Sequence, residues 1–106
     1  MMPTLRSRQV DIHEQSRPIL ARHARLRFDD VRQRWVILAP ERVLVPDEVA
    51  VEILQLCDGE RSVTQIIDAL AAKYAADREV IGEDVMTMLR DLAGKGFLAD
   101  RQDSGS

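Results

Sequence analysis

Apolar and polar side chains alternate along the first part of the chain, which is the spacing of β-strands. From Ala21 onward one face collects Ala24, Leu26 and Phe28, while the other collects His23, Arg25 and Arg27. Residues 35–38 are aromatic or aliphatic and half of them are β-branched, which favours a second strand. A turn at residues 39–42 holds a proline where a type I turn needs a fixed φ, and residues 43–45 form the return strand. These patterns predict an antiparallel meander.

After Pro46, which cannot donate to a strand ladder, the apolar spacing becomes that of an amphipathic helix. Three helices are predicted, each opened by a side chain that can accept from the free N–H groups of a first turn. The expected N-caps are Asp47, Ser62 and Asp77, and the expected ends are Asp58-Gly59, residues 75–77 and Gly96. The fold class is therefore α+β, with a three-stranded antiparallel sheet followed by three helices.

The third predicted helix carries two apolar stripes rather than one. The first comprises Ile81, Val85, Met88 and Leu92; the second, offset by roughly 100°, comprises Gly82, Met86, Leu89 and Ala93, with Arg90 just beyond it. One stripe is enough to attach a helix to a small core. The second consists of small residues, a leucine and an adaptable methionine, which suits a surface that receives another molecule.

Length and composition are typical of a soluble globular protein with one domain. The chain has 106 residues, of which 45% are hydrophobic and 31% are charged. Residues 20–99 are expected to fold, residues 1–19 to form a mobile N-terminal arm, and residues 100–106 to form a flexible tail. No apolar run approaches the roughly 20 residues of a membrane span, and the N-terminus lacks the features of a secretory signal. We therefore expect a cytoplasmic protein without membrane contact.

The net charge of −3 hides an uneven distribution. Residues 1–46 hold nine arginines against five acidic residues, whereas residues 47–106 hold six basic residues against thirteen acidic ones. Non-specific affinity for nucleic acids comes from clustered lysine and arginine side chains. The acidic helical half therefore argues against a nucleic-acid partner.

Residues able to carry out chemistry are few and scattered. His13 and His23 have no carboxylate or cysteine at metal-ligand spacing. Cys57, the only cysteine, falls on the apolar face of the first predicted helix, where a buried small side chain is a simpler interpretation than a nucleophile. Neither a glycine-rich phosphate loop nor a Ser-His-Asp arrangement is found. The sequence thus indicates a protein that is not an enzyme, with no catalytic residue, metal or cofactor.

The two outer strands of the predicted meander differ in how they protect their open edges. The first carries Arg25 and Arg27, charges that discourage another strand from pairing, and the third, Val43 to Val45, carries none. Next to a helix with a spare apolar stripe, such an edge allows an extended peptide to add as a further strand. The alternative is that the third helix covers this edge, or that its second stripe belongs to the core.

Three motifs resemble those of the PqqD family of pyrroloquinoline quinone (PQQ) biosynthesis. They are RxRWVxLAPERV at residues 32–43, LCDGE at residues 56–60 and DLAxKGxL at residues 91–98. The resemblance spans about Pro18 to Leu98. It implies a winged-helix-like fold and a non-catalytic peptide chaperone, one of the leader-recognition domains of ribosomal peptide modification. Such a protein binds the precursor peptide PqqA and presents it to the radical SAM enzyme PqqE.

The resemblance also implies a site, because in this class the leader lies as an extra strand between the third strand and the third helix. Val43, Leu44 and Val45 would then supply backbone partners, and Met86, Leu89 and Ala93 would line the opposite wall. Arg90 would meet an acidic group of the peptide. A proline at Leu44 is expected to abolish peptide binding, with a proline at Val43 as the control for the phase of the strand.

Two other functions remain open at this point. A DNA-binding winged helix has the same elements, although residues 77–95 hold five acidic and three basic residues, which is unusual for a helix that reads a groove. A structural dimerisation module would pair the Val43 to Val45 edge with its own copy, and such a homodimer is also compatible with peptide binding.

Overall fold

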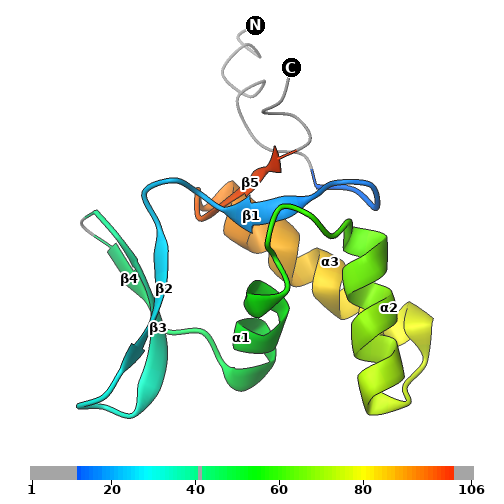
Figure 1. Cartoon of the computed structure of the whole chain (residues 1–106), viewed down its shortest axis with the longest axis horizontal. Coiled ribbons are helices and arrows are strands. Elements are labelled where there is room, and N and C mark those ends of the chain that lie inside the picture. Colours follow the sequence, from blue (N-terminus) through cyan, green and yellow to red (C-terminus); the bar gives the residue numbers. More distant parts are fainter. Residues whose placement is uncertain (1–11, 41, 102–106) are drawn as a thin grey trace, which may run out of the picture.

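The computed structural model describes residues 12–40 and 42–101 (Figure 1). In this described part four strands come first, three helices follow, and one more strand comes last. They are β1 Pro18–Leu20, β2 Arg25–Asp29, β3 Arg34–Ala39, β4 Arg42–Leu44, α1 Glu48–Gln55, α2 Val63–Tyr74, α3 Arg78–Gly94 and β5 Leu98–Asp100. The α+β class is confirmed, and the winged-helix label holds as an analogy only.

The strands form two separate sheets. β2, β3 and β4 make a three-stranded antiparallel meander, which we call the wing, and β1 pairs antiparallel with β5. Figure 1 shows the wing standing to one side of the helices, while the β1–β5 pair lies across the top of them. The wing is the predicted meander, and its order confirms β4 as an outer strand.

The helices begin where the sequence predicts. The Asp47 side chain accepts from the Ala50 backbone N–H at 2.8 Å, and the Asp77 side chain accepts from the Glu79 backbone N–H at 2.9 Å. Ser62 and Gln65 form a reciprocal capping box at the start of α2. Each cap satisfies donors that a first turn leaves without intrahelical partners, which is why the local sequence is sufficient to locate these ends.

The β1–β5 pair is not anticipated by the sequence pattern, and it moves both boundaries of the expected domain. Residues 12–19, assigned above to a mobile arm, lie in the folded part: Ile12 is 1% exposed, and Ser16 is fully buried. Asp100, assigned to the tail, belongs to β5. Strands of three residues are too short for alternation to be visible, and partners 82 positions apart, such as Pro18 and Asp100, leave no local signal. Residues 1–11 and 102–106 lie outside the described part.

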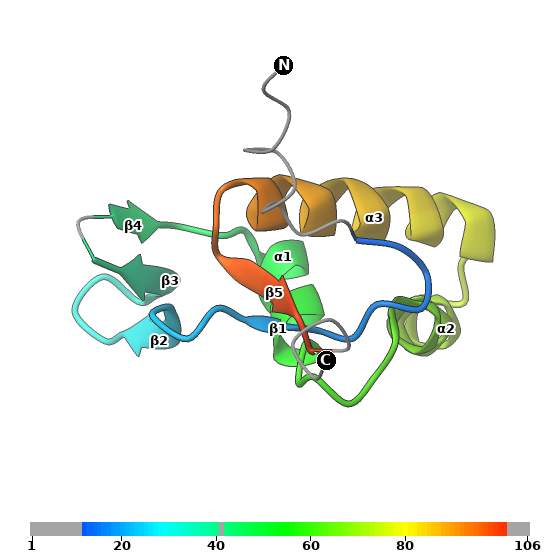
Figure 2. The same cartoon turned by 90° about the horizontal axis from the view of Figure 1, so that it is seen from above.

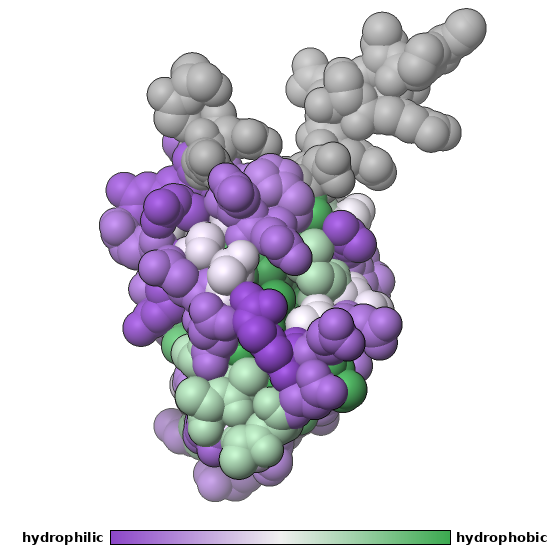
Figure 3. Space-filling model, turned by 90° about the vertical axis from the view of Figure 1, so that its right-hand side faces the viewer, coloured by the Kyte–Doolittle hydropathy of each residue, from purple (hydrophilic) through white to green (hydrophobic). Residues whose placement is uncertain are grey.

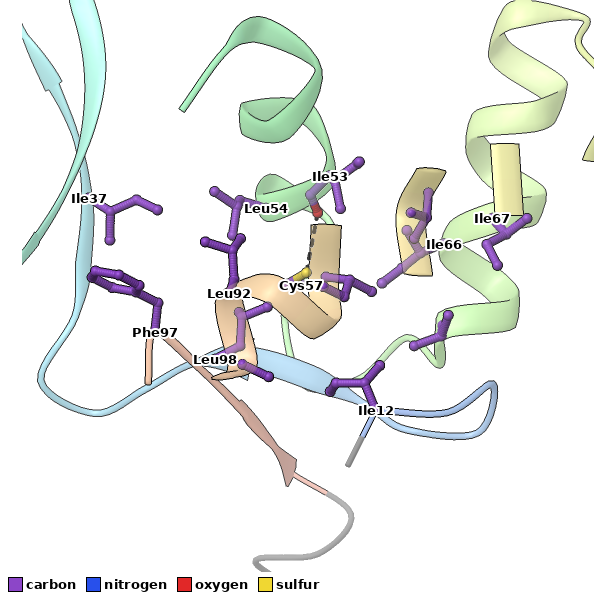
Figure 4. Packing of buried hydrophobic residues seen from close by; sticks show 14 of the residues in the cluster. Ile12, Ile37, Ile53, Leu54, Cys57, Ile66, Ile67, Leu92, Phe97 and Leu98 are labelled. Carbon is purple, nitrogen blue, oxygen red and sulfur yellow. Dashed lines mark hydrogen bonds between the residues drawn. The ribbon is translucent and has the colours of Figure 1, made fainter. Parts of the chain in front are cut away.

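The core lies between the three helices and the β1–β5 pair, and one strand of the wing reaches into it. Figure 4 shows Phe97, from the turn after α3, between Ile37 of β3 and Leu92 of α3. Ile37 and Phe97 are 0% and 2% exposed. Burial of such side chains is the main stabilising contribution of a small domain, so this contact fixes the wing to the body of the molecule.

The backbone conformation at Gly59 and its close neighbours explain why the LCDGE motif contains a glycine. Its φ is +79°, a conformation that other residues rarely adopt. A Cβ at this position would lie 2.8 Å from the Arg101 side chain and 3.1 Å from that of Ile19. The Gly59 N–H donates to the Pro18 carbonyl, so the turn after α1 is bonded directly to β1.

Candidate functional site

β4 forms one of the two open edges of the wing. β4 is the last strand in the order β2, β3, β4, so one side of it has no strand partner in that sheet. Val43 is 65% exposed, and Val45, just beyond the strand, is 47% exposed. Figure 2 shows this strand near the C-terminal end of α3.

The hairpin between β3 and β4 determines which backbone groups point to the open edge. Ala39 pairs with Arg42 across a two-residue loop, and Ile37 pairs with Leu44. The pair that closes a two-residue hairpin exchanges hydrogen bonds, and bonded pairs then alternate along the ladder. Arg42 and Leu44 therefore bond to β3, whereas the N–H and C=O of Val43 point away from it. The sequence analysis took Leu44 as the residue whose N–H faces the open edge, with Val43 as the control, whereas the register places the outward N–H at Val43.

Arg42 connects the same strand to the end of α3. Its guanidinium lies 4.5 Å from the centroid of the Phe97 ring, which is itself buried. A guanidinium over an aromatic face is attracted by the quadrupole of the ring. This contact holds β4 close to the turn that follows α3, and no local sequence pattern predicts it.

On α3, two of the expected site residues belong to the core. Leu89 is 0% exposed and Ala93 is 7% exposed, and both pack in the main hydrophobic cluster. A side chain without accessible surface cannot touch a ligand unless the helix moves. Part of the second apolar stripe is thus core, as the alternative interpretation held.

Met86 and Arg90 line a cavity of about 490 Å³ between α2, α3 and the segment before β1, residues 12–17, which we call the N-terminal segment. The Arg90 Nε donates to the Ile12 carbonyl at 3.3 Å. The apolar lining comes from Ile67, Gly82 and Met86, and the rim carries Glu14, Arg78, Glu79, Glu83 and Arg90. Figure 3, which views the side where α2 and the start of α3 lie, shows a narrow strip of hydrophobic surface among hydrophilic side chains.

The expected site residues consequently occupy two different places. Figure 1 shows the N-terminal segment above α3, whereas the chain leaving β4 passes below the C-terminal end of that helix. Met86 and Arg90 face the N-terminal segment, so they do not lie on the flank nearest β4. The groove predicted between β4 and the second stripe differs from the structure in this respect.

The flank of α3 opposite Met86 carries residues that the sequence analysis did not assign to the site. Met88 follows Met86 by two positions, about 200° around the helix, and is partly buried against the core. Asp91 and Lys95 form an ion pair of 3.0 Å on the same flank. Helical phase alone could have identified this set, but only the position of Ile12 shows which flank is already covered.

Groups that could support catalysis are not gathered at any of these places. Among residues 12–40 and 42–101, no cluster of histidine, cysteine, aspartate or glutamate could hold a metal ion. Burial raises the pKa of the Cys57 thiol to about 12, and Asp58 adds to this shift. Its Sγ donates to the Ile53 carbonyl at 3.3 Å (Figure 4). The thiol therefore stays protonated and is a poor nucleophile at neutral pH.

A second cavity, of about 360 Å³, lies between β3, α1 and α2. Trp35 and Val49 line it beside Glu52, whose carboxylate accepts from the Lys73 ammonium and the Tyr74 hydroxyl. These two hydrogen bonds, led by that of Lys73, lower the pKa of Glu52. An acid kept ionised by its partners is suited to holding α1 against α2 rather than to transferring protons.

No helix in the described part of the chain is long and apolar enough to cross a membrane.

Comparison with known proteins gives consistent matches. The family model for coenzyme PQQ synthesis protein D (PqqD) matches residues 34–98. A protein of Rhodopseudomonas palustris (strain HaA2) named PqqA binding protein is 68% identical over 97 residues, which cover 92% of this chain and 95% of that protein. The bifunctional coenzyme PQQ synthesis protein C/D of Methylorubrum extorquens is 47% identical over 81 residues, which cover 76% of this chain and 22% of that protein.

Two solved structures are similar as well. The solution NMR structure of the PqqD truncation of Methylobacterium extorquens PqqCD has a TM-score of 0.71 and 43% identity, covering 84% of this chain and 95% of that one. It is described as a functional, stand-alone recognition element for ribosomally synthesized and post-translationally modified peptides (RiPPs). The crystal structure of PqqD from Xanthomonas campestris has a TM-score of 0.50 and 40% identity, covering 80% and 94%. From the match to the family model and the similarity to these relatives, we conclude that the chain belongs to the PqqD family.

Proposed function

We propose that this chain is a PqqA binding protein of PQQ biosynthesis, a RiPP recognition element that carries the precursor peptide without modifying it. The observation that supports this most directly is the 68% identity, over 92% of the chain, to a protein named PqqA binding protein. Identity at this level over nearly the whole length is expected of proteins that share a fold. The solved relative with a TM-score of 0.71 is itself described as a recognition element.

The peptide binds by adding a strand to β4. The open N–H and C=O of Val43 supply hydrogen bonds to it, and the exposed side chains of Val43 and Val45 flank it. Leu44, whose backbone is bonded to β3, contributes its inward side chain to the base of the groove. In the absence of peptide, the same edge is available to a second copy of the chain.

The α3 wall of this groove is formed by Met88 and the Asp91–Lys95 ion pair. Met86 and Arg90 contribute through the cavity beside the N-terminal segment, where Arg90 can receive an acidic group of a peptide long enough to pass over the helix. Leu89 and Ala93 support the helix from within the core. A methionine adapts to peptide side chains of different shapes, which suits it to the wall.

The carrier acts in the cytoplasm by tethering and has no turnover of its own. A peptide held on β4 reaches the radical SAM enzyme PqqE at an effective concentration far above its free concentration, provided that the enzyme binds the carrier at the same time. The gain in rate comes from this local concentration rather than from any group on the carrier.

The test is calorimetry of this protein against synthetic PqqA peptide, with Val43→Pro and Val43→Ala compared with the unchanged chain. Proline at Val43 removes an N–H that faces the open edge, so we expect binding to be lost while the helix signal in circular dichroism is retained. Val43→Ala is the matched control, because it shortens the same exposed side chain and keeps the backbone N–H.

The outcomes separate function from mechanism. Loss of binding only in Val43→Pro supports strand addition at β4. If Val43→Pro folds and binds as tightly as the unchanged chain, PqqA binding stands and strand addition at β4 is wrong. If the unchanged chain does not bind the peptide at all, the proposed function itself is wrong.

A further inference from the structure

The outward face of the wing has a composition unlike the rest of the surface. Side chains of a strand alternate between faces, and the register aligns Arg25 with Leu38 and Arg27 with Val36. Leu38 is in turn aligned with Val43. The opposite face carries Leu26, Ile37 and Leu44, which pack on the core. We call the outward set the arginine face; it comprises Arg25, Arg27, Arg34, Leu38 and Val43, together with Val36, which is only 7% exposed.

This face combines positive charge with exposed apolar surface. The arginines are exposed, and Leu38 and Val43 are 39% and 65% exposed. Across the described residues of β2, β3 and β4 there are four arginines and one acid, Asp29. Asp29 is already engaged: its carboxylate accepts from the Val31 and Arg32 backbone N–H groups and pairs with the Arg32 side chain at 3.4 Å. These bonds lower the pKa of Asp29.

The arginines of β2 are too far from β4 to serve a peptide added there. Neighbouring strands lie about 4.8 Å apart, so a strand added beyond β4 lies three spacings, about 14 Å, from β2. The arginine face is nevertheless continuous with that strand, because alternate side chains of an added strand would stand in the same plane as Val43. A protein seated on this face would therefore contact both the carrier and the peptide it carries.

We propose that the arginine face is the docking surface for a protein partner whose contact surface is acidic around an apolar centre. On the proposed function, on which this inference rests, that partner is the modifying enzyme. Arginine side chains at the rim guide the encounter and fix its orientation, and the apolar centre supplies the affinity that remains when salt screens the charges.

A nucleic acid is the less suitable occupant. Leu38 and Val43 would lie against phosphates and would contribute no binding affinity, because duplex binding depends on neutralising phosphates with basic groups. The acidic residues of the helical half, thirteen against six basic ones over residues 47–106, would also repel a duplex extending beyond the wing. A protein surface of limited area and mixed chemistry fits both components of the face.

The experiment measures binding of purified PqqE from the same organism to this protein by calorimetry, at about 50 mM and about 300 mM salt. Arg27→Glu is compared with Arg61→Glu, which makes the same change of net charge in the turn before α2, remote from the wing. We expect Arg27→Glu to weaken binding at least about tenfold and to reduce its salt dependence, and Arg61→Glu to do neither. Leu38→Ser should weaken binding equally at both salt concentrations.

Parallel titrations with PqqA peptide distinguish this inference from the proposed function. Loss of enzyme binding in Arg27→Glu with retained peptide binding supports the arginine face. If the enzyme binds Arg27→Glu and Leu38→Ser as tightly as the unchanged protein, the face is not the docking surface, whether or not the peptide binds. Failure of the unchanged protein to bind the enzyme, or tight binding of a DNA duplex lost in Arg27→Glu, would also overturn the inference. In each case the peptide titration decides the proposed function separately.

Discussion

Cys57 is an example of a reactive residue type made inert by its position. It is 6% exposed, and its thiol donates to a backbone carbonyl one helical turn earlier. Desolvation disfavours the thiolate, and the neighbouring carboxylate of Asp58 adds to the effect, so the pKa rises to about 12. The sequence alone suggested burial because this residue falls on an apolar face, and the structure confirms it.

We predict that Ellman's reagent labels Cys57 orders of magnitude more slowly in the folded protein than in about 6 M urea, because only unfolding exposes the thiol. The unfolded thiol releases its proton near its ordinary pKa of 9.0, whereas the folded thiol holds its proton up to about 12. The free energy of unfolding should therefore be unaffected by this group below the lower value and fall as pH rises between the two.

The matched variant for this prediction is Cys57→Ala, which lacks the titrating group. Urea unfolding of both proteins across the alkaline range gives the contribution of Cys57 as a difference, so other titrating groups cancel. Fast labelling of the folded protein, or an alkaline loss of stability equal in both proteins, would contradict the prediction.

Two side chains of β4 reach the body of the molecule: Leu44 packs against the core, and Arg42 lies over Phe97. This strand has only three residues and one paired neighbour, so its own hydrogen bonds hold it weakly. A guanidinium over a buried ring contributes about 0.5–2 kcal/mol. The position of the proposed binding edge therefore depends on a side chain that makes no part of the predicted hydrophobic pattern.

We predict that Arg42→Ala lowers the free energy of unfolding by about 1 kcal/mol and weakens PqqA binding, because β4 is then less firmly held. Arg22→Ala, at an exposed position in the turn before β2, should change neither quantity. Urea unfolding and peptide calorimetry of both variants provide the measurement. An Arg42→Ala protein with unchanged affinity would show that the position of β4 does not depend on this contact.

At the scale of the whole molecule, the first and last described segments of the chain pair with each other. β1 pairs with β5, the Arg101 N–H donates to the Arg17 carbonyl, and Ile12 inserts into the core beside the helices (Figure 4). The same segment covers one flank of α3 through the bond from Arg90 to Ile12. The first residues described thus complete the core and also decide which side of α3 is left for a ligand.

We predict that Ile12→Ala lowers the free energy of unfolding by about 2–5 kcal/mol, the usual cost of removing a buried isoleucine side chain. Val31→Ala is the control: its side chain is 88% exposed at the turn between β2 and β3, so little change is expected. Chemical unfolding of both proteins would decide. If the two variants are equally stable, the N-terminal segment does not form part of the cooperative core.

The helices and the meander could be predicted from the sequence, because interactions between residues close in the chain determine them. The caps at Asp47, Ser62 and Asp77 and the alternation in β2 and β3 act over a few residues, so the helices and the meander could be predicted from them. The open edge of β4 could also be predicted from the sequence, because a meander leaves one side of its last strand without a partner.

Tertiary structure alone decided the remainder. The β1–β5 pair joins segments from the two ends of the chain, and neither strand is long enough to show a period. On α3, helical phase gives the angle between two stripes but not which of them meets the core, the N-terminal segment or β4. That choice rests on contacts such as Arg90 with Ile12, 78 positions apart, and on the burial of Leu89. Contacts over such separations leave no trace in the local pattern, because it is the packing of the whole chain that forms them.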